Sequence, residues 1–429
     1  MKARFIFNEF FIRMFLLMIL CIVYSCSVKC QSREQVEEFC IHPDVKTILI
    51  YRKGWELSMP VIYKDETERL ELRFDFLGEP ENNYSYSIQN CTYDWYCNDI
   101  PEHYYLEGFN DVPIYDYQPA RNTTKYFTHY VTQLPTDDLK ILQSGNYLIK
   151  IYNSGNPEEV VFTRKFCIAE KKVEISARVR RPDYQNQELS IQIHLGDMKL
   201  MNPLEEIKLV ILKNYDWNNK VEINSPPVLR ENTLYIDLPF QIMTNSGNEF
   251  RYFDTKSTKY TSERVEFIEY RAPEYHYILK PDELKQYKPY FYSTDLNGHF
   301  FVEIPDAHDR HTEADYVQVH FTLESIQPLG TDVYIYGALT DWQTSENNYM
   351  IYNPERSAYE KTLLLKQGYF NYAYVTRDYN SSRNSAEITE GNHDETENDY
   401  LIFIYLRKTI SNIDRLVGYT IINSSDKNR

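Results

Sequence analysis

The sequence predicts an all-β protein made of about three consecutive immunoglobulin-like β-sandwich domains. The chain has 429 residues, and at about 150 residues per domain this length corresponds to roughly three hydrophobic cores. Aromatic residues make up 15% of it and tyrosine alone contributes 39 residues, whereas glycine contributes only 13, a balance typical of strands. Short runs of alternating polarity recur between turn clusters, and no helical period persists along the chain.

The first domain is expected over residues 40–169. Strands are predicted at residues 47–51 and 70–74, where β-branched, aromatic and other apolar residues recur. A turn is predicted at residues 78–83, which are rich in Gly, Pro and Asn. Residues 162–168 then form the predicted closing strand of this domain.

The middle domain is expected over residues 170–292. Its predicted strands include residues 173–177, 189–193 and 209–212, which are rich in Ile, Val and Leu. Three prolines, at positions 273, 281 and 289, interrupt the tyrosine-rich passage that follows, so we expect the domain to end there.

The C-terminal domain is expected over residues 293–429. Its predicted strands include residues 300–302, 317–321, 333–336 and 401–405. These apolar and aromatic runs are the clearest sandwich pattern in the chain.

The first thirty residues are predicted to be a signal peptide. Lys2, Arg4 and Arg13 precede an apolar run over residues 14–24, which at about eleven residues is too short to span a bilayer of roughly 30 Å. The sequence Val-Tyr-Ser-Cys that ends at Cys26 resembles a bacterial lipobox, so lipidation of Cys26 and ordinary cleavage before Gln31 both remain open. Either route predicts an exported mature chain.

The net charge and the cysteine content limit the functions that the sequence allows. The formal net charge of -17 disfavours nucleic acid as a partner, because no basic stripe offsets the repulsion from phosphate. Four cysteines follow the signal region, and two bridges are candidates in an oxidising compartment, with buried thiols as the alternative. Cys40 and Cys167 flank the first domain, whereas Cys91 and Cys97 share one aromatic segment.

Six strings along the chain together resemble the type IX secretion system plug protein family, formerly a domain of unknown function in Bacteroidetes. In chain order they are SGNYLIKIY, GNEFRYFD, EADYVQVHFTL, LKQGYFNY, ETENDYLIFIYLR and DRLVGY. The resemblance covers about residues 46–423.

The resemblance implies a non-enzymatic periplasmic protein. Such a protein docks on the very large outer-membrane translocon barrel of the type IX system and closes its periplasmic mouth until cargo arrives. A lipid anchor at Cys26 would hold it at the outer membrane. Arg251 and Arg415, which lie within two of the resembling strings, are candidate partner contacts, with strand pairing as the structural alternative.

A second resemblance suggests glycan binding as an alternative function. Residues 333–342 resemble the start of glycogen-binding-type early-set sandwiches, in which an aromatic face stacks on a sugar ring. Trp342 matches the first stacking tryptophan and Asn398 a polar residue near the final strand. Ala373 replaces the expected lysine, and Tyr379 is the nearest substitute for a second tryptophan, so the match departs from the family pattern.

No pattern of residues predicts catalysis, a cofactor or a metal. The sequence lacks a Gly-x-Ser-x-Gly elbow, a phosphate-binding glycine loop and a dinucleotide fingerprint. The histidines at positions 308 and 311 are expected in a solvated loop, because Pro305 precedes them and their spacing is not that of zinc ligands. We therefore expect no enzymatic activity and no cofactor.

Overall fold

β-strands account for most of the regular structure, and the expected all-β fold class is confirmed. The computed structural model describes residue 35 and residues 38–78, 83–97, 100–377, 383–407 and 413–426. Glu37–Arg429 form one unit by their contacts, and the structure described below lies within it. In these described segments, no helix has the length and apolar character needed to cross a bilayer.

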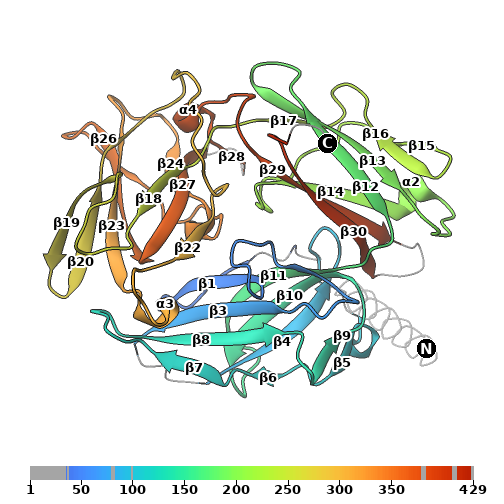
Figure 1. Cartoon of the computed structure of the whole chain (residues 1–429), viewed down its shortest axis with the longest axis horizontal. Helices are drawn as coiled ribbons and strands as arrows, with labels where there is room; N and C mark the ends of the chain where they lie inside the picture. The colour runs from blue at the N-terminus through green and yellow to red at the C-terminus, as the bar shows by residue number, and fades with distance from the viewer. Residues whose placement is uncertain are drawn as a thin grey trace, which may run out of the picture. The chain divides into compact units, whose positions relative to one another are not determined.

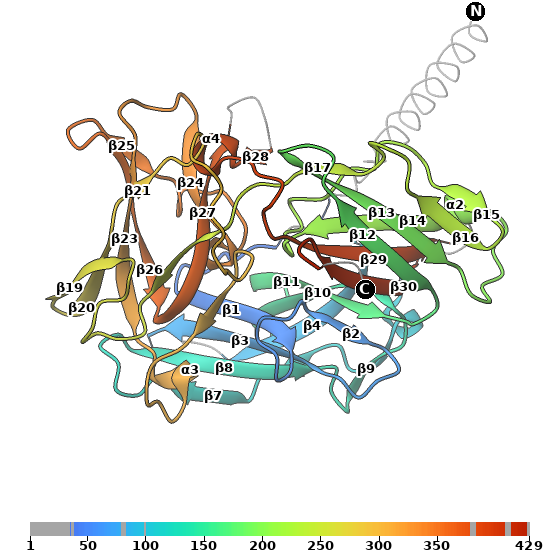
Figure 2. The same ribbon diagram turned by 45° about the horizontal axis from the view of Figure 1, so that its top comes forward.

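The described strands enclose three hydrophobic cores. We call the strands around them the first, middle and third sandwich, in the order in which each begins along the chain. Figures 1 and 2 show their strands in two views.

The first sandwich pairs two sheets that face each other. One sheet has the order β1 (Val45–Arg52), β3 (Leu70–Leu77), β8 (Phe127–Leu134) and β7 (Asp116–Pro119). The other has the order β2 (Val61–Tyr63), β11 (Val160–Ala169), β10 (Gly145–Asn153), β4 (Tyr84–Cys91) and β6 (Val112–Pro113). A small ladder of β5 (Leu106–Gly108) and β9 (Leu139–Ile141) follows the 3-10 turn η1 (Glu102–Tyr104).

Aromatic side chains fill the core of the first sandwich. Phe74 stacks on Tyr130 with ring centroids 4.8 Å apart, and Phe162 meets Phe74 edge-on at 5.0 Å. Strand β3 is buried on both faces, since even Asp75 is only 1% exposed. The outer face of the sheet that contains β3 is therefore covered, and the third sandwich covers it.

The middle sandwich is closed by strands from the end of the chain. One sheet has the order β12 (Glu174–Arg180), β13 (Asn186–His194), β16 (Thr233–Ile236) and β15 (Val228–Arg230), with β17 (Met243–Asn245) also on β13. The other has β14 (Ile207–Lys213), which follows the short helix α2 (Pro203–Glu206), then β29 (Asp399–Arg407) and β30 (Asp414–Asn423). Figure 1 shows β29 and β30, in red, beside the green β14.

The third sandwich is inserted between β17 and β29. One sheet is β18 (Arg251–Asp254), β27 (Gly368–Arg377) and β22 (Phe300–Val302), with β24 (Asp332–Tyr336) and β28 (Asn384–Ser385) also on β27. The other is β19 (Val265–Arg271), β20 (Glu274–Leu279), β23 (Tyr316–Glu324), β26 (Ala358–Lys366) and β25 (Ile351–Asn353), with β21 (Asp282–Glu283) on β23. Three short turns connect these strands, namely α3 (Arg310–Glu313), η2 (Ala338–Thr340) and α4 (Glu387–Glu390).

Strand pairing therefore cuts across the division expected at residues 292 and 293. Strands β18, β19 and β20 lie before that point but pair within the third sandwich, whereas β29 and β30 lie after it and complete the middle sandwich. The physical reason is burial: Ile402 and Ile404 of β29 are fully buried in the core that contains Ile191 and Ile211.

Candidate functional site

A cleft of about 460 Å3 lies where segments of all three sandwiches meet. Aromatic and charged side chains line it together. The first sandwich and its connections contribute Tyr51, Glu56, Arg164 and Lys165, the loop after β14 contributes Tyr215 and Trp217, and the third sandwich contributes His299, Asp341, Trp342, Arg377 and Asn384. We call this space the junction cleft.

Trp342 is placed in the junction cleft by an unusual local backbone. Asp341 and Trp342 both have left-handed conformations, with φ of 54° and 56°, directly after η2. The indole approaches Gly298 so closely that a Cβ there would lie 2.3 Å from Cη2 of Trp342. Glycine is therefore required at position 298, where φ is also positive at 83°.

The Trp342 ring is held by its neighbours. It packs edge-on against Phe250, His299 and Tyr336, with ring centroids 6.1, 5.7 and 5.5 Å away. The side chain of Asn218 donates a hydrogen bond to the Trp342 carbonyl at 2.8 Å. These contacts join the middle and third sandwiches and give the tryptophan a structural role.

Asn398 does not share a site with Trp342. It is buried in the middle sandwich, where its amide donates to the Ser246 carbonyl and accepts from Asn214, at 2.9 and 2.8 Å. It does not line the junction cleft. Tyr379 and Cys26 lie outside the described residues.

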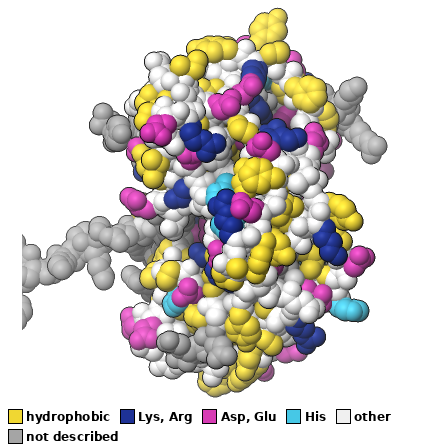
Figure 3. Space-filling model, turned by 90° about the vertical axis from the view of Figure 1, so that its left-hand side faces the viewer, with side chains coloured by type: hydrophobic (Ala, Val, Ile, Leu, Met, Phe, Trp, Pro, Cys, Tyr) yellow, Lys and Arg dark blue, Asp and Glu magenta, His cyan; other side chains and the backbone are white. Residues whose placement is uncertain are grey.

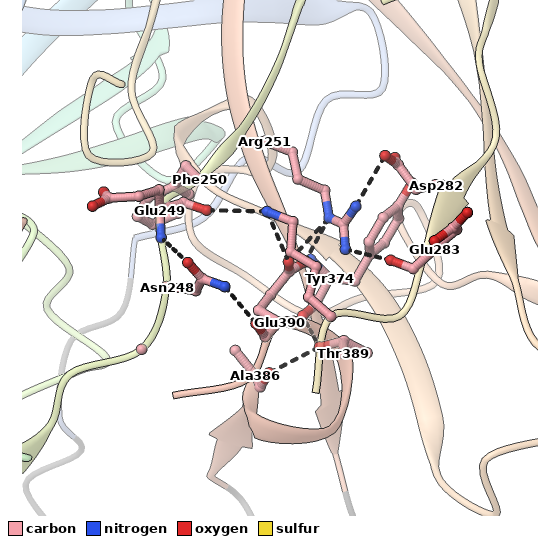
Figure 4. Close-up of polar contacts among 12 residues, drawn as sticks. Asn248, Glu249, Phe250, Arg251, Asp282, Glu283, Tyr374, Ala386, Thr389 and Glu390 are labelled. Carbon is pink, nitrogen blue, oxygen red and sulfur yellow. Dashed lines mark hydrogen bonds and ion pairs between the residues drawn. The ribbon is translucent and has the colours of Figure 1, made fainter. Parts of the chain in front are cut away.

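Arg251 lies in a buried ionic network of the third sandwich, drawn in Figure 4. Its guanidinium pairs with Asp282 at 2.9 Å and with Glu390 at 2.9 Å, and it donates to the Glu283 carbonyl at 2.8 Å. The Glu390 carboxylate also accepts the backbone N–H of Tyr374. All these groups are satisfied by each other, so Arg251 fixes β18, β21 and α4 and does not face solvent as a contact.

Arg415 ties β30 to the end of the first sandwich. Its Nε donates to Glu170 at 3.1 Å, and the backbone N–H of Glu170 donates to the Leu416 carbonyl at 2.9 Å. Burial alone would raise the pKa of Glu170, but hydrogen bonds from Arg415 and Ser144 hold that pKa below its ordinary value. Arg415 therefore connects two sandwiches.

The four cysteines at positions 40, 91, 97 and 167 do not form the wider of the two expected pairs, Cys40 with Cys167. The Cys40 thiol donates to the His42 carbonyl at 3.4 Å, and the Cys167 thiol to the Asn146 side chain at 3.3 Å. Burial raises the pKa of Cys167, which makes it an inert thiol. Cys91 and Cys97 face each other across an isolated antiparallel bridge.

A second ionic cluster joins the first and third sandwiches, and sequence reasoning did not identify it. Lys366 of β26 pairs with Asp75 of β3 at 2.5 Å, and both side chains are 1% exposed. Asp75 also contacts His129 and accepts from the Tyr316 hydroxyl, each at 2.6 Å. No sequence spacing relates positions 75 and 366, so only the fold could find this pair.

Of the two histidines expected in a loop, His308 is exposed in a bend, as expected, whereas His311 lies in the one-turn helix α3. The Asp309 side chain caps it by accepting the His311 backbone N–H, and Arg310 pairs with Glu56 at 2.7 Å. His311 stacks on His129 with ring centroids 5.4 Å apart, and burial lowers the pKa of His311 to about 2. Within the described segments, no group of His, Cys, Asp and Glu has the arrangement of a metal site.

Large aromatic side chains are exposed on the first sandwich. In the segment from η1 to β7, Phe109 is 86% and Tyr115 82% exposed, and Tyr104 and Tyr117 are also exposed. No Lys or Arg occurs in residues 100–120, whereas four exposed carboxylates do: Glu102, Glu107, Asp111 and Asp116. We call these eight side chains the acidic aromatic face. Figure 3 shows one face of the molecule, on which apolar side chains are interspersed with both acidic and basic ones.

Comparison with known proteins matches both the first sandwich and the whole architecture. A family model described as type 9 secretion system plug protein 1st domain matches residues 45–170. A crystal structure of a hypothetical protein from Parabacteroides merdae has a TM-score of 0.87 and 31% sequence identity, with 91% of this chain and 100% of that chain covered. No curated protein matches the chain.

Proposed function

The chain belongs to the type 9 secretion system plug protein family, and from this premise we propose that it docks on the outer-membrane translocon barrel of that system and occludes its periplasmic mouth. The match of the family's first domain to residues 45–170 carries the proposal. The predicted export signal is consistent with work in the periplasm. The function is occlusion, without catalysis.

A protein that occludes a wide opening must be rigid. The polar contacts between the sandwiches favour rigidity. The buried Lys366–Asp75 pair joins the first and third sandwiches, and the Arg415–Glu170 pair joins β30 to the first. The Tyr336 hydroxyl donates to buried Asp216 at 2.6 Å, which joins the third sandwich to the middle one. Such buried polar links oppose hinge motion more strongly than exposed ones do.

We infer that the acidic aromatic face is the docking contact. Exposed aromatic rings give a large contact area with little loss of rotamer freedom. Glu107 pairs with Lys140 at 3.2 Å. The other three carboxylates add a negative field, which favours a protein partner with basic side chains and opposes contact with anionic lipid. The face lies on the domain that the family model matches.

Co-purification of the full chain from gently solubilised envelopes of its native host tests the proposal. We expect a very large outer-membrane barrel to be recovered with the wild type and to be lost, or strongly reduced, with the double variant Phe109→Ala/Tyr115→Ala. Both side chains are more than four-fifths exposed, so the double variant should fold normally.

A matched control is available on the other two sandwiches. Tyr184 and Tyr287 are 88% and 90% exposed, so Tyr184→Ala/Tyr287→Ala removes a similar aromatic area elsewhere. This control should retain the barrel. Recovery of no barrel with the wild type would contradict the proposed function, whereas equal recovery with both double variants would contradict only the docking face.

Glycan binding around Trp342 and Asn398, the alternative that the sequence suggested, gains no support from their placement. The two side chains lie in different sandwiches, and the indole is enclosed by Phe250, His299 and Tyr336. A stacking platform on the outer surface of the third sandwich would need an open indole face.

A further inference from the structure

Cys91 and Cys97 lie opposite each other at the end of β4. They form an isolated antiparallel bridge, and the backbone N–H of Thr92 donates to the Tyr96 carbonyl at 2.9 Å. A bond between the residues next to a bridge is the pattern of a non-hydrogen-bonded pair, in which the Cα atoms are about 4.5 Å apart and the side chains are close. A disulfide usually joins Cα atoms about 4.4–6.8 Å apart, so two cysteines in such a pair are close enough to be bridged.

The two thiols also contact each other. A hydrogen bond with the Cys97 side chain is the largest cause, ahead of burial, of the raised pKa of the Cys91 thiol. Cys91 is fully buried, whereas Cys97 is partly exposed. An oxidant in solution therefore reaches Cys97, and Cys91 lies behind it as the second thiol.

The residues between the two cysteines form a turn that packs on the middle sandwich. Trp95 is fully buried and meets Trp217, of the loop after β14, edge-on with ring centroids 4.8 Å apart. Trp217 in turn stacks on Phe403 of β29 at 5.6 Å. The Trp95 backbone is left-handed, with φ of 65°, which a bulky residue seldom adopts unless its surroundings hold it there.

Polar contacts join the same turn to β29 and β30. The Tyr93 backbone N–H donates to the Asp414 carboxylate at 2.8 Å, and the Arg407 guanidinium lies over the Tyr93 ring, 4.7 Å from its centroid. Arg407 also pairs with Asp414 at 2.5 Å. The turn at residues 92–96 is therefore one of the contacts that join the first sandwich to the middle one.

We propose that Cys91 and Cys97 form a disulfide in an oxidising compartment, and that this bond fixes the turn at residues 92–96 against the middle sandwich. The oxidant is a disulfide of another molecule. The Cys97 thiolate attacks that disulfide and releases one thiolate, and Cys91 then attacks Sγ of Cys97 in the mixed disulfide and releases the other. The two cysteines lose two protons and two electrons, and the oxidant becomes two thiols. The bond does not depend on docking on a barrel.

Thiol alkylation of the purified native chain, after incubation with oxidised glutathione, tests the bond. The chain is denatured, alkylated and mapped by mass spectrometry. We expect Cys91 and Cys97 to escape alkylation until dithiothreitol is added. Proteolytic cleavage before Asp94 separates the two cysteines, so peptides that stay joined identify the bond.

Cys40→Ser is the matched control, because Cys40 is exposed and its thiol donates to the His42 carbonyl. This variant should keep the bond between Cys91 and Cys97, whereas Cys97→Ser should abolish it. Alkylation of both Cys91 and Cys97 in the oxidised wild type, or a bond from either to a different cysteine of the chain, would overturn the proposal.

Hydrogen exchange tests what the bond does to the turn. A disulfide restrains the short loop over residues 91–97 even when the turn opens, so we expect the amides of residues 92–96 to exchange about tenfold slower than after reduction. Strand β23 of the third sandwich is the internal control and should exchange equally in both forms. Equal exchange of the turn in the oxidised and reduced chains would overturn its fixation by the bond.

Discussion

Asp75 and Lys366 show what single residues contribute to the junction of the first and third sandwiches. Burial would raise the pKa of Asp75, but the charge of Lys366 and the hydrogen bond with His129 hold that pKa below its ordinary value. Replacing Lys366 by Met leaves the carboxylate buried without its cation. We expect this change to lower the free energy of unfolding by about 3–5 kcal/mol, measured by urea denaturation.

The exposed pair Lys140–Glu107 provides the comparison. Its side chains are 59% and 62% exposed, so Lys140→Met should change the stability little. The double variant Asp75→Asn/Lys366→Met should recover part of the stability that Lys366→Met loses, because the uncompensated charge is then absent. Equal effects of Lys366→Met and Lys140→Met would show that the buried pair does not hold the sandwiches together.

Asp295 gives a pH-dependent test of the third sandwich. Burial raises the pKa of Asp295 to about 7 from an ordinary value of 3.8, although it accepts the backbone N–H groups of Asn297 and Phe250. The native state therefore binds more protons than the unfolded state between about pH 4 and pH 7. This group's contribution to the free energy of unfolding is present below pH 4 and is lost as pH rises to 7.

Asp295→Asn removes that titration. The variant loses one backbone acceptor and should be less stable than the wild type at low pH, and the difference should shrink as pH rises from about 4 to about 7. Urea denaturation across this window measures it. A difference that does not change with pH would mean that Asp295 titrates normally in the folded protein.

At the scale of residues, the sequence pattern does not show which polar side chains pair in the folded chain. Arg251 and Arg415 are candidate partner contacts because they lie in resembling strings, but both are ion-paired within the structure. Local alternation cannot show which carboxylate lies across a sheet from an arginine. The groups that define the junction cleft, such as Glu56 and Asn384, carry no sequence pattern and meet only through the fold.

The hairpin of β29 and β30 shows the same limit at the scale of elements. The sequence predicted a strand at residues 401–405, and β29 is there. Its partner β14 lies nearly two hundred residues earlier, beyond the third sandwich. Local patterning predicts that a segment is a strand, whereas the choice of its partner strand depends on long-range burial. The expected domain boundaries therefore divide the chain into consecutive segments, but the observed strand pairing joins segments that are far apart in the sequence.

Ile404→Ala tests the assignment of this hairpin to the middle sandwich. Ile404 is fully buried, so we expect a loss of about 2–5 kcal/mol. Hydrogen exchange should accelerate mainly in β13 and β14, and less in β23. Ile421→Ala, on the adjacent β30 but 38% exposed, is the matched control and should have a small effect. Faster exchange in β23 than in β14 would contradict the assignment.

At the scale of the whole molecule, we propose that this sandwich protein is exported and docks on a secretion barrel. The family match covers the first sandwich, and the similarity to the Parabacteroides merdae structure extends the shared architecture over 91% of the chain. The all-β class and the family were both predictable from the sequence, because patterning and the six strings are local features. The face that meets a partner depends on exposure, which only the folded chain shows.

Site-specific photo-crosslinking in the native host tests whether the chain docks on the barrel through the acidic aromatic face. A photoreactive residue replaces Phe109 in the acidic aromatic face or, as a control, Tyr287 on the third sandwich; both side chains are highly exposed. We expect a crosslink from position 109 to a very large outer-membrane barrel and none from position 287. Absence of the barrel from the position 109 adducts, or its capture only from position 287, would contradict docking through this face.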